Sequence, residues 1–187
     1  MTTKMNREES GQALIELSFA LVILCVFVFG IIDFGRAIYD VQVMKNLVGE
    51  GSSMASRQGL PSLGNTATTV AADAGRDLNM STAGCVIVTQ VSNMGSGSIQ
   101  VTGQASSGGI SGTAACRSKV GCVSGTSGCG SSNATVPSAV TNALTTEGTN
   151  SAIYVTEIYY NFQTITPVTA LLGSSVMPSQ FYAVAYY

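Results

Sequence analysis

The feature that most constrains this chain is an uncharged run of 16 residues, LSFALVILCVFVFGII, from Leu17 to Ile32. A helix rises about 1.5 Å per residue, so this run would cover roughly 24 Å, and the 21 residues that begin at Gln12 about 31 Å. Since the hydrocarbon core of a bilayer is about 30 Å thick, the segment is long enough to span a membrane. It does so only with Glu16, the one charge between Gln12 and Ile32, inside or at the edge of the hydrocarbon.

Three interpretations of this segment compete. A cleaved secretory signal needs a basic start and a small-x-small cleavage site, but the two basic residues among residues 1–11 are balanced by two acidic ones, and no convincing site follows Ile32. A plain membrane anchor leaves Glu16 with an unexplained cost of about 2.5–3.5 kcal/mol if it sits near the bilayer centre. The third is a prepilin-type leader, a short polar segment that ends in glycine and is followed by a carboxylate at position +5.

The third interpretation accounts for both Gly11 and Glu16. The stretch GQALIEL, residues 11–17, resembles the processing site of type IV pilin-like proteins. The resemblance implies that a prepilin peptidase cuts after Gly11, and that the new amine of Gln12 pairs with the Glu16 carboxylate when subunits pack. A buried carboxylate is tolerated when a cation neutralises it, and one helical turn separates the two groups. The sequence departs from the best-known pilins at Gln12-Ala13, where they usually carry Phe-Thr.

The residues that follow resemble a narrower family. The segment GIIDFGRAIY, residues 30–39, and the later Gln42, Asn46, Gly49–Gly51 and Ala55 are similar to the TadE-like pseudopilins of tight-adherence (Tad/Flp) pilus systems. This resemblance covers about residues 10–57. Residues 154–162 and 166–173 also resemble a strand and a "PLTPLLG" element of that family, whereas residues 85–150 show no resemblance.

The resemblance implies a structural minor pilin or pseudopilin and not an enzyme. Such a protein lies in the bacterial inner membrane as a single-pass protein with its C-terminal head outside the cytoplasm. Its partners would be the prepilin peptidase, other pilin or pseudopilin subunits and the Tad assembly machinery, in a pilus used for surface adhesion. The alternative from another class is a membrane-anchored extracytoplasmic binding or adhesion domain that is never processed.

The hydrophobic pattern predicts one long helix over about 13–57. Apolar or small residues recur at alternating spacings of four and three, which is typical of a narrow packing seam; they are Ile23, Phe27, Gly30, Phe34, Ala37, Val41, Met44, Val48, Gly51 and Ala55. Gly59 and Pro61 are expected to end the helix, as a C-cap glycine followed by proline does.

The remainder is predicted to form a small α+β head with an antiparallel sheet of three or four strands packed against the N-terminal helix. Asn65-Thr66 would cap a short helix near 67–79. Strands are expected at 85–91, 98–102, 151–162 and 180–187. A Gly/Ser-rich excursion without periodicity occupies about 103–135, and is too long for a bare loop in a compact domain. We therefore divide the chain into a leader, 1–11, an assembly helix, 12–59, and an exported head, 60–187.

Composition argues against several function classes. Only 10% of the residues are charged, against roughly 25% in ordinary soluble proteins, and the net charge is −2. Without a basic stripe, we expect no nucleic-acid partner. Histidine is absent, which excludes Ser-His and Cys-His nucleophile pairs. No phosphate-binding glycine motif lies between a strand and a helix. We therefore expect no catalytic residues, no cofactor and no small-molecule substrate.

Four of the five cysteines lie in the expected head. Cys25 falls in the apolar run, whereas Cys85, Cys116, Cys122 and Cys129 fall beyond it without any C-x-x-C spacing. On the exported side of a membrane, four thiols most simply make two disulfides. Free thiols or a site of four thiolates around a metal stay as alternatives, and the sequence does not choose among the three possible pairings.

Overall fold

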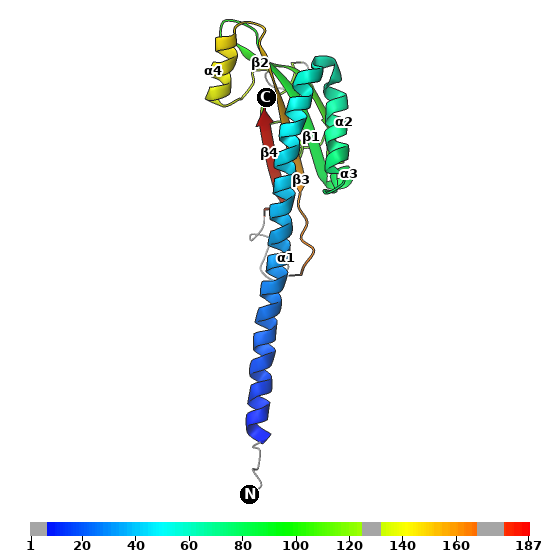
Figure 1. Cartoon of the computed structure of the whole chain (residues 1–187), viewed down its shortest axis with the longest axis vertical. Helices are drawn as coiled ribbons and strands as arrows, with labels where there is room; N and C mark the ends of the chain where they lie inside the picture. Colours follow the sequence, from blue (N-terminus) through cyan, green and yellow to red (C-terminus); the bar gives the residue numbers. More distant parts are fainter. Residues whose placement is uncertain (1–6, 125–131, 168–177) are drawn as a thin grey trace. The chain divides into compact units, whose positions relative to one another are not determined.

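The computed structural model describes residues 7–124, 132–167 and 178–187, with side chains from Gly11 onward. The chain divides into two compact units. The stem unit comprises residues 1–38 and 163–178, and the head unit comprises residues 39–162 and 179–187. A long apolar helix and a head with a four-stranded antiparallel sheet make the protein α+β, as predicted (Figure 1).

Helix α1 (Arg7–Gln58) contributes to both units. It ends close to its predicted end, because Gly59 adopts a φ of 75° and Pro61 lies in the 3-10 turn η1 (Leu60–Ser62) that follows.

From Phe34 onward, the predicted seam of α1 is wrong at two positions. Phe34 is 50% exposed and Val41 is half-buried, whereas Asp33 and Asp40 are buried. The seam was predicted from apolar and small residues alone, so buried acidic residues were not included in it. Asp33 turns inward because segment 163–167 supplies hydrogen-bond donors for its carboxylate.

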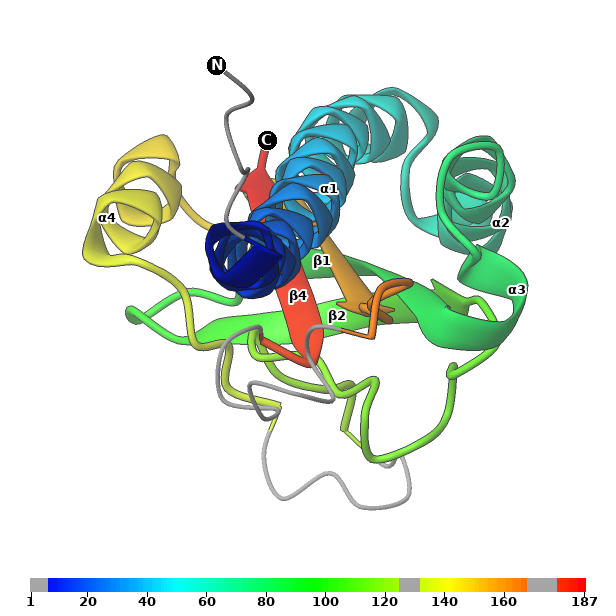
Figure 2. The same cartoon turned by 90° about the horizontal axis from the view of Figure 1, so that it is seen from below.

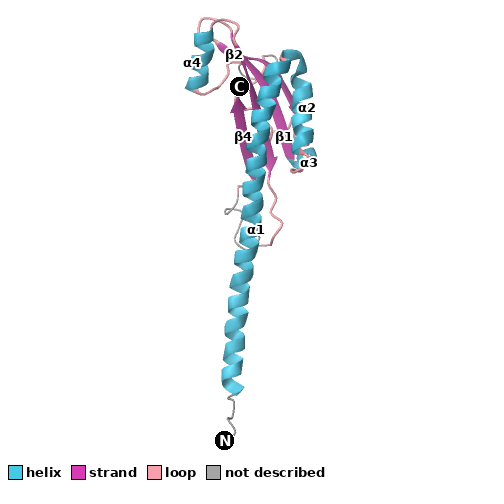
Figure 3. Cartoon of the chain, in the orientation of Figure 1, coloured by secondary structure: helices cyan, strands magenta, loops and turns pink. Residues whose placement is uncertain are grey.

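The sheet has the strand order β2-β1-β3-β4, and every neighbouring pair is antiparallel (Figure 3). Its strands are β1 (Gly84–Asn93), β2 (Ile99–Ser107), β3 (Ala152–Asn161) and β4 (Gln180–Tyr186). All four were predicted, but β2 continues beyond residue 102. The excursion therefore begins at Gly108 and not at 103. Residues such as Gly103 and Ser106 favour a loop locally, yet pairing with β1, including Gln104 Nε2 to Thr89 Oγ1 at 2.9 Å, holds them in the strand.

One face of the sheet is covered by helices, as Figure 2 shows for α1 and α2. Helix α2 (Leu63–Ala74) packs on β1 and β2, and the four-residue α3 (Met80–Ala83) follows it. The prediction of a helix near 67–79 capped by Asn65-Thr66 is wrong in its bounds. The N-cap is Ser62, and Thr66 is buried inside the helix. The turn η1 and α2 follow α1 almost directly, so no Asn-capped start is needed.

Within the head unit, α1 approaches β3 closely through two small residues. A Cβ atom placed on Gly51 would lie 3.0 Å from the side chains of Thr156 and Val70. The neighbouring Ser52 is fully buried; its hydroxyl accepts the Thr156 N–H at 3.1 Å and donates to the Ala185 carbonyl at 3.0 Å. One side chain of α1 thus bridges β3 and β4.

The opposite face of the sheet is covered by the excursion and by α4 (Ser138–Glu147), a helix that the sequence analysis missed. The excursion places Val120 and Cys116 against the sheet, while Leu144 of α4 joins the same core as Val120 and Val155. Asn93 at the end of β1 holds α4 in place, because its side-chain amide donates hydrogen bonds to the carbonyls of Leu144 and Gly148, both at 3.0 Å.

The close contact at Gly51 gives a prediction about stability. Gly51→Leu should lower the free energy of unfolding of the head by about 1–3 kcal/mol, because the added side chain overpacks the junction of α1, α2 and β3. Gly49→Ala is the matched control: nothing lies within 4 Å of its Cβ position, so removing a helical glycine should raise stability by up to about 1 kcal/mol. Denaturant unfolding of the full chain in detergent measures both. Equal stability of the two variants would contradict the close packing.

Candidate functional site

The candidate site begins with the apolar part of α1 in the stem unit. Phe19 and Ile31 are 70% and 71% exposed, and the other exposed large side chains there are Leu14, Ile15, Leu17, Leu21, Val22, Ile23, Leu24, Phe27, Val28, Phe29 and Ile32. The Ser18 hydroxyl donates to the Leu14 carbonyl at 2.8 Å and is therefore satisfied inside the helix. By length and composition, this part of α1 is a candidate membrane-spanning helix.

The residues of the predicted cleavage site lie on this same helix. Gly11, Gln12 and Glu16 are all exposed, and no atom beyond the helix lies within 4 Å of the Gly11 Cβ position. Within the described part of the chain, Glu16 has no hydrogen-bond or ion-pair partner. Among the described residues, Gly11, Gln12 and Glu16 therefore lie on the exposed surface of α1.

A second stripe runs along the stem part of α1, on the side away from Asp33 and Ala37. Its members alternate at spacings of four and three and are all exposed; they are Leu24, Val28, Ile31, Gly35 and Ile38. Among the residues that the structure describes, none comes within 4 Å of the Gly35 Cβ position. This stripe was not predicted, because the predicted seam lies on the side of α1 that continues into the head.

The side of α1 that bears Asp33 holds the segment that follows β3. Asp33 is 2% exposed; its carboxylate accepts the Ile165 N–H at 3.2 Å and the Thr166 hydroxyl. Arg36 adds a longer contact to the Gln163 carbonyl at 3.4 Å. Two stretches that carry the family resemblance, residues 30–39 and the start of residues 166–173, therefore meet at one buried carboxylate. Residues 168–173 lie outside the described residues.

Residues 11–52 match the family model for TadE-like proteins. The matched segment contains the predicted cleavage site, the exposed apolar side chains and the Asp33–Arg36 contacts. It thus confirms the resemblance over this part of the chain and points to a structural rather than a catalytic protein. No curated protein and no solved structure matches the chain.

Beyond the TadE-like segment, the structure places the cysteines of the head. Cys85 of β1 and Cys116 of the excursion form a disulfide that closes 31 residues, and their Cα atoms are 6.1 Å apart. Cys122 is also disulfide-bonded, Cys25 is a free thiol in α1, and Cys129 lies outside the described residues.

A buried carboxylate, Glu157 of β3, lies next to this disulfide, and the sequence analysis did not single it out. Glu157 is fully buried and accepts the Ser118 hydroxyl, the Lys119 N–H at 2.9 Å and the Tyr182 hydroxyl at 2.8 Å. Burial, and then the charge and hydrogen bonding of Glu157, raise the pKa of the Tyr159 and Tyr182 hydroxyls well above the ordinary tyrosine value. The sequence did contain a signal for this buried carboxylate, because Glu157 interrupts the apolar pattern of residues 153–162.

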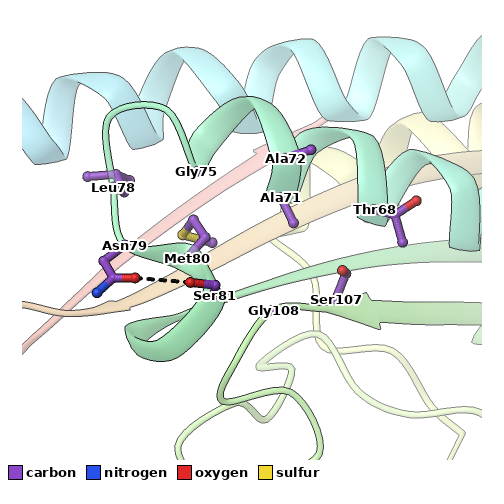
Figure 4. A pocket seen from close by; sticks show the side chains of 10 residues that line it. All are labelled: Thr68, Ala71, Ala72, Gly75, Leu78, Asn79, Met80, Ser81, Ser107 and Gly108. Carbon is purple, nitrogen blue, oxygen red and sulfur yellow. Dashed lines mark hydrogen bonds between the residues drawn. The ribbon is translucent and has the colours of Figure 1, made fainter.

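The head also has a shallow pocket of about 310 Å³ between α2, α3 and the end of β2 (Figure 4). Its lining is uncharged and mostly small, with Leu78 and Met80 as the larger apolar members and Thr68, Asn79, Ser81 and Ser107 as the polar ones. The Ser81 hydroxyl donates to Asn79 Oδ1 at 3.1 Å. None of the lining side chains is an acid, a base or a nucleophile activated by a base, so the pocket offers no acid–base machinery.

The Asp33 contacts give a prediction about the stem. Asp33→Ala should release segment 163–167 from α1 and speed hydrogen exchange of the Ile165 amide about 5- to 150-fold, the range expected for roughly 1–3 kcal/mol. Asp33→Asn, which keeps one acceptor, should give a smaller increase. Phe34→Ala, at the exposed neighbouring position, should leave the rate unchanged. Unchanged exchange in Asp33→Ala would contradict the anchoring role of the carboxylate.

Proposed function

We propose that this protein is a minor pilin or pseudopilin that helps to assemble a Tad-like pilus or becomes part of one. The observation that carries the proposal is the coincidence of the TadE-like segment with the exposed apolar part of α1. Large apolar side chains exposed along a helix need a membrane or other helices to cover them. A pilin requires both in turn, first a bilayer and then neighbouring subunits.

The same proposal gives the domains their roles. Residues 1–11 are a leader that a prepilin peptidase removes after Gly11, residues 12–59 are the assembly helix, and residues 60–187 are the exported head. The protein is held in the bacterial inner membrane by one span with its head outside, and the finished pilus mediates surface adhesion. The exposed stripe of Leu24, Val28, Ile31, Gly35 and Ile38 supports helix packing, since its spacing suits contact between helices and Gly35 permits close approach.

Glu16 has a specific role in this proposal. In a lone subunit its carboxylate lies at the membrane edge, where it stays in contact with water. When assembly helices pack, the carboxylate is drawn away from water and needs a cation. Cleavage after Gly11 creates that cation as the new amine of Gln12, in the same subunit or in a neighbour.

An unprocessed membrane-anchored binding domain is the second candidate. It is favoured by one observation: the TadE-like match ends at residue 52 and leaves most of the head unmatched. In that case Glu16 only marks the membrane boundary, and any polar residue there would serve.

A substitution at Glu16 tests whether its carboxylate forms the charge pair or only marks the membrane boundary. Glu16→Gln should leave the protein inserted and cleaved but poorly recruited to the pilus machinery, because breaking one side of a buried charge pair costs about 3–5 kcal/mol. The measurement is co-purification with pilus components from membranes. Glu50→Gln, which removes an exposed carboxylate from the head part of α1, is the matched control and should co-purify normally. Normal recruitment of Glu16→Gln would rule out the charge pair and leave the pilin-like architecture standing, whereas absence of the unaltered protein from the pilus components would favour the anchored binding domain.

A further inference from the structure

Five consecutive residues of the excursion, 116–120, each contact the sheet; we call them the clasp. Cys116 is bonded to Cys85, and the Arg117 carbonyl accepts the Tyr159 hydroxyl at 2.7 Å. Ser118 and Lys119 both donate to Glu157. Val120 is 1% exposed and packs against Val155. Among the described residues, no other stretch of the excursion combines a disulfide, hydrogen bonds to a carboxylate and an apolar contact with the sheet.

Glu157 lies at the centre of these contacts. Its fully buried carboxylate sits on β3, paired with Ile87 of β1 on one side and with Val184 of β4 on the other. Removing a carboxylate from water is costly unless hydrogen bonds satisfy it. The sheet supplies the Tyr182 hydroxyl, and the remaining close donors come from Ser118 and Lys119 of the clasp. The carboxylate is therefore fully satisfied only when the clasp is docked.

During folding, Cys85 can form a disulfide with any of three cysteines of the excursion. Cys116, Cys122 and Cys129 lie within 13 residues of one another in the excursion. Loop-closure entropy changes only with the logarithm of loop length, so it favours Cys116 over Cys129 by less than about twofold. Chain length alone would give a mixture of pairings, whereas the structure has one partner for Cys85.

We propose that Glu157 is a positioning residue that selects Cys116 as the disulfide partner of Cys85. By binding Ser118 and the Lys119 amide, the carboxylate docks the clasp before oxidation and places Cys116 beside Cys85. The two thiols then lose two protons and two electrons to a thiol–disulfide oxidant, whose own disulfide is reduced to two thiols. Lys119 also places its ammonium 3.8 Å from the centre of the Tyr182 ring, which holds the clasp against β4.

The order of events distinguishes this role from a purely structural one. A glutamate that only stabilises the finished head would act after the disulfide forms and would leave the choice of partner unchanged. A glutamate that selects the partner must hold the clasp on the sheet when no disulfide is present. Two quantities therefore have to be measured: the choice of disulfide partner for Cys85, and the docking of the clasp on the sheet in a chain that lacks the disulfide.

Oxidative refolding of the full chain in detergent tests the pairing. The reduced, unfolded chain is refolded in a glutathione redox buffer, free thiols are alkylated at intervals, and peptides containing Cys85 are identified by mass spectrometry. In the wild type, Cys116 should be the main partner of Cys85 from the earliest times. Glu157→Gln should lower the early ratio of Cys85–Cys116 to the other Cys85 pairings at least threefold. Glu147→Gln, an exposed carboxylate of α4, is the control and should pair as the wild type does.

Hydrogen exchange tests the docking of the clasp, and it tests the proposal independently if Glu157→Gln does not fold. In a full chain that carries Cys85→Ser and Cys116→Ser, the Lys119 amide should remain protected from exchange. Adding Ser118→Ala, which removes one donor to Glu157 and leaves the carboxylate in place, should speed that exchange at least fivefold. A rapidly exchanging Lys119 amide in the double serine variant, or unchanged early pairing in Glu157→Gln, would overturn the proposal.

Discussion

The apolar surface of α1 in the stem unit is the constraint on which the rest of this protein depends. Leaving one large apolar side chain in water instead of burying it forgoes about 1.5–3 kcal/mol, and exposed side chains of this kind follow one another from Leu14 to Ile32. A head of this size has a net stability of the same order as a few such side chains. Whatever covers this surface of α1 therefore decides where the chain can exist.

The same helix also organises the head. Between residues 39 and 58 its buried side chains include Met44, Val48 and Ala55, and Ser52 bridges β3 and β4. The opposite face of the sheet is covered by the excursion and α4, whose apolar residues include Val120 and Leu144. The excursion is held there by a disulfide and by the carboxylate of Glu157. In both units, a buried acidic residue fixes a segment that has little core of its own: Asp33 for residues 163–167 and Glu157 for the clasp.

Regular patterns in the sequence predicted the long helix, the four strands and the α+β class. Prediction failed where tertiary contacts replaced the local signal. Gly103 to Ser107 join β2 because β1 offers them a pairing edge, and Asn65-Thr66 do not cap α2 because the chain turns earlier at Gly59 and Pro61. Asp33, Asp40 and Glu157 are buried polar groups, which a hydrophobic pattern leaves out. The resemblance drew attention to Gly11, Gln12 and Glu16 because it rests on a motif, whereas the docking of the excursion depends on contacts distant in sequence.

Processing as a pilin can be read from the intact mass of the protein extracted from membranes of cells with an active prepilin peptidase. We expect a chain that begins at Gln12 and contains 176 residues, 11 fewer than the full 187. A bulky residue in place of Gly11 should restore the uncleaved mass. A full-length mass for the unaltered protein in those cells would contradict the pilin account and leave a membrane-anchored head in its place.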